Sequence, residues 1–335
     1  MFWFATASLM PVPLIVLACT SGGIFPALAV LSITVLVFFM DKLARDLPEG
    51  RSSGRGLSVT LALVHFPLLF LGVWALAGQG DHGVLDRILI FTALGLFAGQ
   101  ISNSNAHELI HAATRLHRRL GAAVYVSLLH GHHVSAHLQV HHVHAATDAD
   151  PNSARRGEGF WRYAARVLKG EFVAGLRAAT VRRARANLPV WRHPYLAYVA
   201  GGLAMLAFSV MLAGPGGALA HLGIAAYAQL QLLLSDYVQH YGLRRRTTPS
   251  GKPEPIGPEH SWNAPNWYSS AMMLNAPRHS DHHVHPARPF PALRMEGATM
   301  PVLPHSLPVM AVIALLPPLW RRVMDPRVAR WQKTA

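Results

Sequence analysis

Six long apolar segments restrict what this chain can fold into more than any other feature. They cover residues 5–20, 24–40, 58–78, 84–104, 195–213 and 217–238. Each is close to the roughly 20 helical residues needed to cross the hydrocarbon core of a bilayer. Backbone amides in lipid must be hydrogen-bonded within their own segment, so each segment is expected to be a helix. Because 51% of the 335 residues are hydrophobic and only 14% are charged, we predict an all-α integral membrane protein with a bundle of six transmembrane helices.

Basic residues occur in alternate connections between these segments. Lys and Arg follow the second, fourth and sixth segments, whereas the turns near Gly22, Gly80 and Gly214 have none. Cytoplasmic loops carry the excess of Lys and Arg, so we expect three hairpins with both termini in the cytoplasm. The basic residues after the second and sixth segments are Lys42, Arg45, Arg51, Arg55, Arg244, Arg245 and Arg246. A cleavable signal peptide is not expected, because residues 1–4 include no basic residue.

The net charge of +14 is concentrated between Ala112 and Pro194, where thirteen Lys or Arg face four acidic residues. Such a stretch suits anionic lipid at the cytoplasmic leaflet. It also suits a small acidic redox protein, through complementary charge. No nucleic-acid-binding motif accompanies the charge, so nucleic acid is not expected as a partner. No soluble domain stands apart from the apolar segments, and we treat residues 1–335 as one membrane-embedded domain.

Histidines gather just beyond the ends of the apolar segments. Three clusters hold His107 and His111 in HELIH, His137, His141 and His142 in HLQVHH, and His279, His282 and His283 in RHSDHH. A ninth residue, His240 in DYVQHYGL, lies at the cytoplasmic end of the sixth segment. Imidazole is a common ligand for iron and zinc. The eight clustered imidazoles already exceed what one tetrahedral zinc can use, so the pattern predicts a cytoplasmic metal site with more than one ion.

Helical spacing predicts which of these histidines act together. His107 and His111 are four residues apart, which places both rings on one helix face where they can reach one ion. His137 and His141 have the same spacing, with His142 turned about 100° aside. The third cluster has i, i+3, i+4 spacing, which keeps all its rings on one face.

Carboxylates are expected near such a site. Two divalent ions in a shell of neutral imidazoles would leave about four positive charges, which nearby acidic side chains would balance. Each acidic residue in or beside the clusters could instead cap a helix or lie in a solvated turn. The candidates are Glu108, Asp148, Asp150, Asp236 and Asp281.

The other histidines are expected to have different roles. His65 and His221 lie inside apolar segments and are predicted to be hydrogen-bonded packing residues. Five more lie close to the clusters and are predicted to support the ligands rather than bind metal, namely His130, His132, His133, His144 and His285. Surface or interfacial positions are expected for His82, His117, His193, His260 and His305.

Two other classes of protein fit parts of this pattern. HELIH matches the HExxH of zinc proteases, but a single zinc would leave most of the histidines without a role. A histidine-rich metal transporter would place histidines inside its spans, whereas here they lie mostly beyond the span ends. Cys19 is the single cysteine, and no GxGxxG or P-loop motif occurs. Redox chemistry in this chain would therefore draw its electrons from another protein.

Three further stretches have distinctive compositions. Residues 117–170 are predicted to form helical pieces interrupted at 147–152, and residues 249–265 a proline-rich loop. Residues 303–320 are apolar but contain four prolines, and are expected to lie in the membrane interface or to pack on the bundle. Four large side chains could border an apolar channel, although each is expected to face lipid or core: Phe38, Phe39, Phe66 and Trp74.

Four motifs occur in an order that is similar to the membrane-bound alkane 1-monooxygenases, relatives of the fatty acid desaturases and the xylene side-chain monooxygenases. They are HELIH, HLQVHHVHAATDADP, DYVQHYGLRR and NAPRHSDHHVHPARPFPALR. The resemblance covers most of the chain from Asn103 to Leu293, together with the six-segment layout. The last two motifs are much more specific than HExxH and favour the hydroxylase branch over the desaturases.

The resemblance implies a non-haem di-iron centre on the cytosolic side of a six-helix bundle in a bacterial inner membrane, reached by a hydrophobic channel. It implies hydroxylation of the terminal methyl of n-alkanes with O2, using electrons from a rubredoxin that an NAD(P)H-dependent rubredoxin reductase reduces. Desaturation or hydroxylation of an acyl chain, or hydroxylation of an aromatic methyl group, is the related alternative. The two irons would be held by His107, His111, His137, His141, His142, His240, His279, His282 and His283.

Several positions depart from the family pattern. The basic residue usual after the first motif is Ala112, the acid usual before the second motif is Ala136, and the acid usual before the histidine of HYGL is Gln239. The usual ATPEDP is ATDADP. No ligand position is lost, so the changes are expected to alter the charge around the metal rather than the ligand set.

Overall fold

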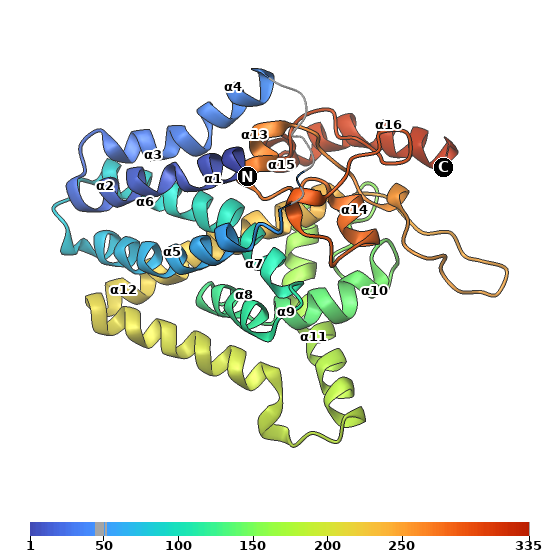
Figure 1. Cartoon of the computed structure of the whole chain (residues 1–335), viewed down its shortest axis with the longest axis horizontal. Coiled ribbons are helices and arrows are strands. Elements are labelled where there is room, and N and C mark those ends of the chain that lie inside the picture. The colour runs from blue at the N-terminus through green and yellow to red at the C-terminus, as the bar shows by residue number, and fades with distance from the viewer. Residues whose placement is uncertain (44–49, 51, 335) are drawn as a thin grey trace.

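The computed structural model describes residues 1–43, 50 and 52–334, and in these residues the fold is almost entirely helical (Figure 1). The β-structure in these residues consists of two isolated β-bridges, between Thr247 and Pro253 and between Asn263 and Val302. The predicted all-α class is confirmed. The helices are α1 (Phe2–Leu9), α2 (Pro11–Ser21), α3 (Phe25–Ile33), α4 (Val35–Leu43), α5 (Arg55–Trp74), α6 (Val84–Leu96), α7 (Asn103–Ile110), α8 (Arg115–Ser127), α9 (His133–Ala136), α10 (His142–His144), α11 (Phe160–Arg185), α12 (Pro194–His240), α13 (Trp267–Met272), α14 (His279–Val284), α15 (Leu307–Ala314) and α16 (Pro317–Thr334).

Short turns of other helix types join these elements. Three π-helical turns extend longer helices, namely η1 (Ala75–Gln79), η2 (Phe97–Ser102) and η3 (His137–His141). Three 3₁₀ turns lie in connections, namely η4 (Val190–Arg192), η5 (Pro258–His260) and η6 (Phe290–Ala292). π-turns inside α-helices are rare and often occur at functional sites.

Five helical runs in the described chain are long and apolar enough to cross a membrane. The first four correspond to the first four predicted segments, and the fifth is the whole of α12. The predicted basic residues Arg45 and Arg51 lie outside the described residues. The runs are Phe2–Ser21, Phe25–Leu43, Arg55–Gln79, Val84–Ile110 and Pro194–His240.

The predicted fifth and sixth segments are two arms of α12. Ala213 and Gly214 leave the helical conformation, with φ at +63° for Gly214, and Pro215 begins the second arm. Figure 1 shows the arms folding back on each other at this bend. Ser209 in the first arm and His221 in the second are hydrogen-bonded, with Oγ and Nδ1 2.7 Å apart.

Buried histidines fasten the helices of the bundle to one another. His65 on α5 lies 2.9 Å from the hydroxyl of Ser102 and 2.8 Å from that of Ser127. His221 lies 2.6 Å from the carbonyl oxygen of Ser127. Both imidazoles therefore satisfy their polar atoms inside an apolar environment, which confirms their predicted role as hydrogen-bonded packing residues.

Two histidines predicted at the surface are buried. His82 is 7% exposed, and its Nε2 lies 2.8 Å from the carbonyl oxygen of Cys19, one of the unpaired carbonyls at the end of α2. His260 is 3% exposed, and its Nε2 lies 3.1 Å from a carboxylate oxygen of Glu254 in the same proline-rich loop. Of the predicted surface or interfacial position, the surface part is wrong for both residues, because each side chain is enclosed by the protein.

The remaining predicted stretches agree with the structure. The interruption predicted at residues 147–152 lies in the connection between α10 and α11. Residues 249–265 form the predicted loop. It contains one 3₁₀ turn and contributes Pro253 and Asn263 to the two isolated β-bridges. The proline-containing stretch 303–320 includes α15, which packs against α12.

Candidate metal centre

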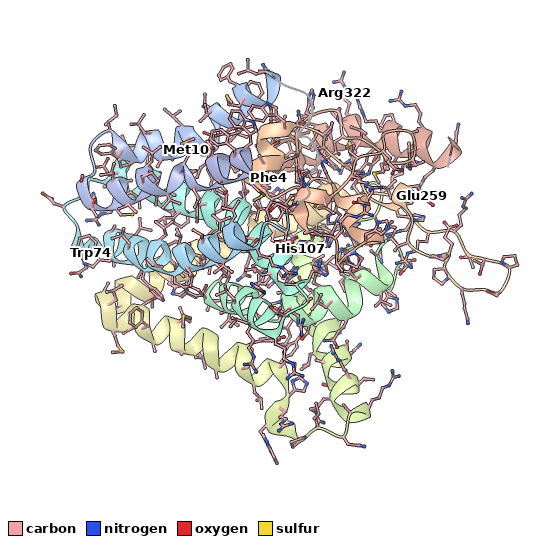
Figure 2. The ribbon with its side chains drawn as sticks, viewed as in Figure 1. Phe4, Met10, Trp74, His107, Glu259 and Arg322 are labelled. Carbon is pink, nitrogen blue, oxygen red and sulfur yellow. The ribbon has the colours of Figure 1, made fainter. Side chains whose placement is uncertain are left out.

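All nine histidines predicted as ligands converge, and they divide into two sets. Within each set, one ring nitrogen from every residue lies within 4.8 Å of all the others. Figure 2 shows one of them, His107, near the middle of the molecule. The five-histidine group consists of His107, His111, His137, His142 and His282, and the four-histidine group of His141, His240, His279 and His283.

Four separate parts of the chain deliver these side chains, mostly at helix ends. His107 lies in the last turn of α7, and His111 is the residue that follows that helix. His240 is the last residue of α12, and His279 is the first of α14. Helix ends place side chains where helices stop at the edge of the bundle, so the histidines meet at or just beyond the ends of the apolar runs.

A π-turn divides the second histidine cluster between the groups. In the π-turn η3, residues five apart in the sequence lie on the same side of the helix. The Nε2 atoms of His137 and His142 are accordingly 2.9 Å apart. His141 joins the four-histidine group instead. The prediction that His137 and His141 reach one ion, with His142 aside, is therefore wrong, because it assumed uninterrupted α-helical spacing.

The third cluster is also shared between the groups. His279 and His283, four residues apart on α14, belong to the four-histidine group, with Nε2 atoms 3.1 Å apart. His282 belongs to the five-histidine group, and its Nε2 lies 3.1 Å from that of His142. The face predicted for this cluster thus serves both groups.

Hydrogen bonds among the histidines cannot satisfy all of their nitrogens. The Nε2 atoms of His240, His279 and His283 form a triangle with sides of 2.9, 3.1 and 3.3 Å. A neutral imidazole nitrogen either donates or accepts, so at least one pair must set two lone pairs or two protons against each other. Nε2 of His141 and of His107 are buried without a hydrogen-bond partner. A cation that accepts the lone pairs removes both problems, so these residues fit bound metal.

Burial keeps the imidazoles neutral. It lowers the pKa of His137, His142 and His282 well below the usual histidine value, and neighbouring histidines lower these pKa values further. The same causes bring the pKa of His111 to about 4 and that of His279 to about 3. At neutral pH each of these five rings therefore carries a lone pair that is free to bind metal.

Of the five carboxylates predicted near the site, Asp150 is the one that hydrogen-bonds a histidine of the two groups. Nδ1 of His141 lies 2.9 Å from Asp150 Oδ2, which also accepts from the hydroxyl of Ser153. Its other oxygen accepts from the backbone N–H of Asn152. Burial alone would lower the pKa of His141, but Asp150 raises it overall. A carboxylate on Nδ1 fixes the tautomer that presents Nε2 to the group.

Replacing Asp150 by Asn is expected to weaken metal retention by about 10- to 100-fold, the usual cost of losing such an outer partner. The substitution keeps the shape of the side chain but removes the charge that holds Nδ1–H of His141. The measurement is metal retained per purified chain after dialysis against increasing chelator. Asp148→Asn is the matched control, since Asp148 is 83% exposed. Equal retention in Asp150→Asn and wild type would contradict the role of Asp150.

The other predicted carboxylates have partners elsewhere. Glu108 accepts from the backbone N–H of Phe290 at 3.4 Å, and Asp236 accepts from the side-chain amide of Asn152 at 2.8 Å. Asp281 accepts from the guanidinium of Arg288, and Asp148 lies on the surface. Asp281 and Glu108 thereby attach the segment that follows α14 to the helices carrying the histidines.

An apolar cavity of about 430 Å³ leads to both histidine groups. His107 and His137 of the five-histidine group and His279 of the four-histidine group border it, and so does Thr92 on α6. At 1.5 Å per helical residue, Thr92 and His107 are about 22 Å apart along the helix run that carries both. Much of the remaining wall comes from α12 and α15, including Leu230, Leu234, Leu307, Pro308, Ala311 and Val312.

Three of the four large side chains expected to face lipid or core lie outside the cavity lining, as expected, and Phe38 is the exception. Phe38 lines the cavity, whereas Phe39, Phe66 and Trp74 are not among its lining residues. Figure 2 shows Trp74 far from His107, toward the other end of the long helices. Phe39 is 57% exposed on the outside of the bundle, in agreement with the expected lipid-facing role.

The departures from the family pattern lie around the same site. Gln239 borders the cavity, donates to the carbonyl of Ala276 at 2.9 Å and accepts from the hydroxyl of Ser235 at 2.8 Å. Ala136 is buried at the contact between α9 and α11. An uncharged residue at each position leaves this part of the site without the carboxylates usual in the family.

Sequence reasoning missed Glu171 on α11. Its side chain is buried, with Oε1 2.6 Å from Nδ1 of His133, and it forms a third group of potential metal donors with His130 and His133. A single glutamate in a basic helix gave no signal of its own. Its partners are 38 or more residues earlier in the chain, and only the packing of α11 on α9 brings them together.

Comparison with known proteins identifies the family. Residues 83–312 match the family model described as fatty acid desaturase. Alkane 1-monooxygenase 2 of Pseudomonas aeruginosa is 32% identical over 290 residues, which are 85% of this chain and 76% of the relative. Alkane 1-monooxygenase 1 of the same organism is 33% identical over 82% of this chain and 73% of its own length. The alkane 1-monooxygenase of Acinetobacter baylyi is 34% identical over 76% of this chain and 62% of its own length.

These matches cover the helices that hold all nine grouped histidines, and they agree with the apolar runs and the histidine groups of the structure. The chain is a membrane protein of the fatty acid desaturase family and belongs to its alkane 1-monooxygenase branch.

Proposed function

We propose that this chain hydroxylates the terminal methyl group of n-alkanes to primary alcohols. One alkane, one O2, two electrons and two protons give one alcohol and one water. The observation that carries the proposal is an apolar cavity whose wall includes histidines of both groups. Such an arrangement lets a hydrocarbon end approach the metal site while its remaining methylenes stay out of water, at about 0.8 kcal/mol for each methylene.

The proposed cofactor is a pair of non-haem iron ions, one in each histidine group. Iron bound by imidazole would supply the activation of O2 and the transfer of one oxygen atom, the chemistry that protein side chains lack. The protein's part is to hold the rings in place, to keep water away and to orient the chain end. The proposed ligands are His107, His111, His137, His142 and His282 for one ion and His141, His240, His279 and His283 for the other.

The lining of the cavity favours an uncharged substrate. The described residues that line the cavity include no Lys or Arg, and Asp236 is the one acidic residue among them. A free fatty acid would have to bring its carboxylate into this environment without a cation to pair with it, which costs free energy. An alkane brings no charge, so hydroxylation of an alkane is favoured over oxidation of a free fatty acid.

Electrons are proposed to come from a rubredoxin, reduced by an NAD(P)H-dependent rubredoxin reductase. A surface groove beside the metal centre is lined by Arg177, Arg182 and Arg185 of α11 and by His144, two residues beyond the grouped His142. A basic groove suits a small acidic redox protein. The proposal includes a single domain with six spans in a bacterial inner membrane, with the histidine groups on the cytoplasmic side, as the alternating basic connections predict.

The test is conversion of octane to 1-octanol by membranes that contain this chain, supplied with rubredoxin, reductase and NADH. We expect 1-octanol to form only when all components are present. A parallel assay with octadecanoic acid separates the related alternative, suggested by the family model, because a desaturase or acyl hydroxylase would give an unsaturated or hydroxylated acid. Acid products without 1-octanol would overturn the proposal, and p-xylene in the same panel tests for an aromatic methyl substrate.

A further inference from the structure

A third group of potential metal donors lies beside the two histidine groups and shares no residue with them. It consists of His130, His133 and Glu171, whose donor atoms lie within 4.8 Å of one another. His130 precedes α9, His133 begins it, and Glu171 lies on α11, which packs against α9 (Figure 1). All three side chains are 2% exposed. The ring of His133 adjoins that of His137 in the five-histidine group, with centroids 5.1 Å apart.

Several buried atoms of this group have no hydrogen-bond partner. Both ring nitrogens of His130 and Oε2 of Glu171 are unpaired, as is Nε2 of the neighbouring His132. Unpaired polar atoms in a protein interior are destabilising. Asp150 provides a contrast, since its oxygens accept from His141, Ser153 and the backbone of Asn152. Glu171 is therefore not simply an outer partner of one histidine, because half of its carboxylate faces an unsatisfied imidazole.

The separation of the unpaired atoms matches a shared ion better than a hydrogen bond. Nε2 of His130 and Oε2 of Glu171 are 3.5 Å apart, longer than an ordinary N–H···O bond. Two ligands that each lie about 2.1 Å from a tetrahedral ion are about 3.4 Å apart. A cation between the two atoms would satisfy both and would also balance the charge of the buried carboxylate.

Close packing of α9 and α11 brings this group together. The packing depends on Ala136, where the family usually has an acidic residue. A Cβ atom added to Gly175, one turn after Glu171 on α11, would lie 3.0 Å from the Cβ of Ala136. An acidic side chain at position 136 would collide with α11 at this contact. The small residues Ala136 and Gly175 therefore allow α11 to approach α9 closely enough for Glu171 to reach His130 and His133.

We propose that His130, His133 and Glu171 bind a third divalent transition-metal ion, distinct from the metal of the nine grouped histidines. Two imidazoles and one carboxylate form a donor set that suits Zn2+ or Fe2+, with a further position left for water. The ion joins α9 to α11 and so fixes the helix that continues into η3. Because His133 also borders the apolar cavity, the ion lies next to the cavity wall.

The test is metal content per chain of the full-length purified protein, measured by elemental analysis for zinc and iron after growth with each metal. His130→Ala and Glu171→Gln are each expected to lose one equivalent relative to wild type and to keep the metal of the nine histidines. Glu171→Gln retains the size of the side chain, so it stays informative if His130→Ala does not fold. His132→Ala is the matched control, because the ring of His132 lies 4.6 Å from that of His130 but outside the donor group.

The zinc and iron arms show which ion occupies the site, and either result supports it. Equal metal content in wild type, His130→Ala and Glu171→Gln would overturn the third site. Loss of all metal in Glu171→Gln would also overturn it, since Glu171 would then support the nine-histidine centre instead. Conversion of octane by the wild type is measured separately, so failure of the third site and failure of the proposed function are distinguishable.

Discussion

His142→Ala is expected to lose turnover by more than about 100-fold, beyond the range typical for removal of an outer hydrogen-bond partner. The Nε2 of His142 lies 2.9 Å from that of His137 and 3.1 Å from that of His282, so its removal opens the middle of the five-histidine group. Metal content is expected to fall by one equivalent, because the four-histidine group is left intact. The measurements are octane conversion and metal per chain on the same purified sample.

His144→Ala is the matched control for this experiment. His144 lies two residues further along the same helix, is exposed and belongs to neither group. We expect it to bind metal as wild type does. Wild-type turnover in His142→Ala, or an equal loss of metal in both variants, would remove His142 from the proposed ligands.

Narrowing the cavity is expected to change which chain lengths are accepted. Thr92 lies about 22 Å and Leu96 about 16 Å from His107 along the helix run, at 1.5 Å per residue. Thr92→Phe should therefore exclude the longest alkanes, and Leu96→Trp should move the limit to shorter chains, since both positions line the cavity. Chains that no longer fit are expected to lose turnover by about 100-fold, the cost of a misplaced reacting group.

The measurement is a product profile for n-alkanes from octane to hexadecane. Ile88→Phe is the matched control, because Ile88 lies one turn before Thr92 on α6 but is 56% exposed and outside the cavity lining. If Leu96→Trp and Thr92→Phe both give the wild-type profile, the substrate does not occupy this cavity.

Local patterns made most of the fold and all nine grouped histidines predictable. An apolar run of about 20 residues has few alternatives to a membrane helix, and a histidine near the end of such a run is already placed at the edge of the bundle. His240 could be found in this way although it stands alone in its motif. The bend at Gly214 could also be anticipated as a boundary, since Gly214 and Pro215 interrupt the pattern.

What could not be predicted depends on backbone register and on contacts between distant segments. No residue type in HLQVH marks a π-turn, so the division of His137 and His141 between two groups was hidden. Glu171 looks like one acid in a basic helix until α11 is packed against α9. Packing of the 303–320 stretch on the bundle was one of two expectations, but its part in the cavity wall was hidden, because no sequence pattern shows which helix face borders a cavity.

The π-turn of η3 has a consequence for how this centre can change. A π-turn amounts to one extra residue inserted into an α-helix, so the assignment of His141 and His142 to different groups depends on residue count rather than on side-chain identity. Exchange of the intervening Leu138, Gln139 or Val140 for other helix-compatible residues leaves that count unchanged. Insertion or deletion of a single residue there would instead reassign every histidine that follows in the helix. The two-site arrangement therefore constrains the length of this segment independently of its side chains.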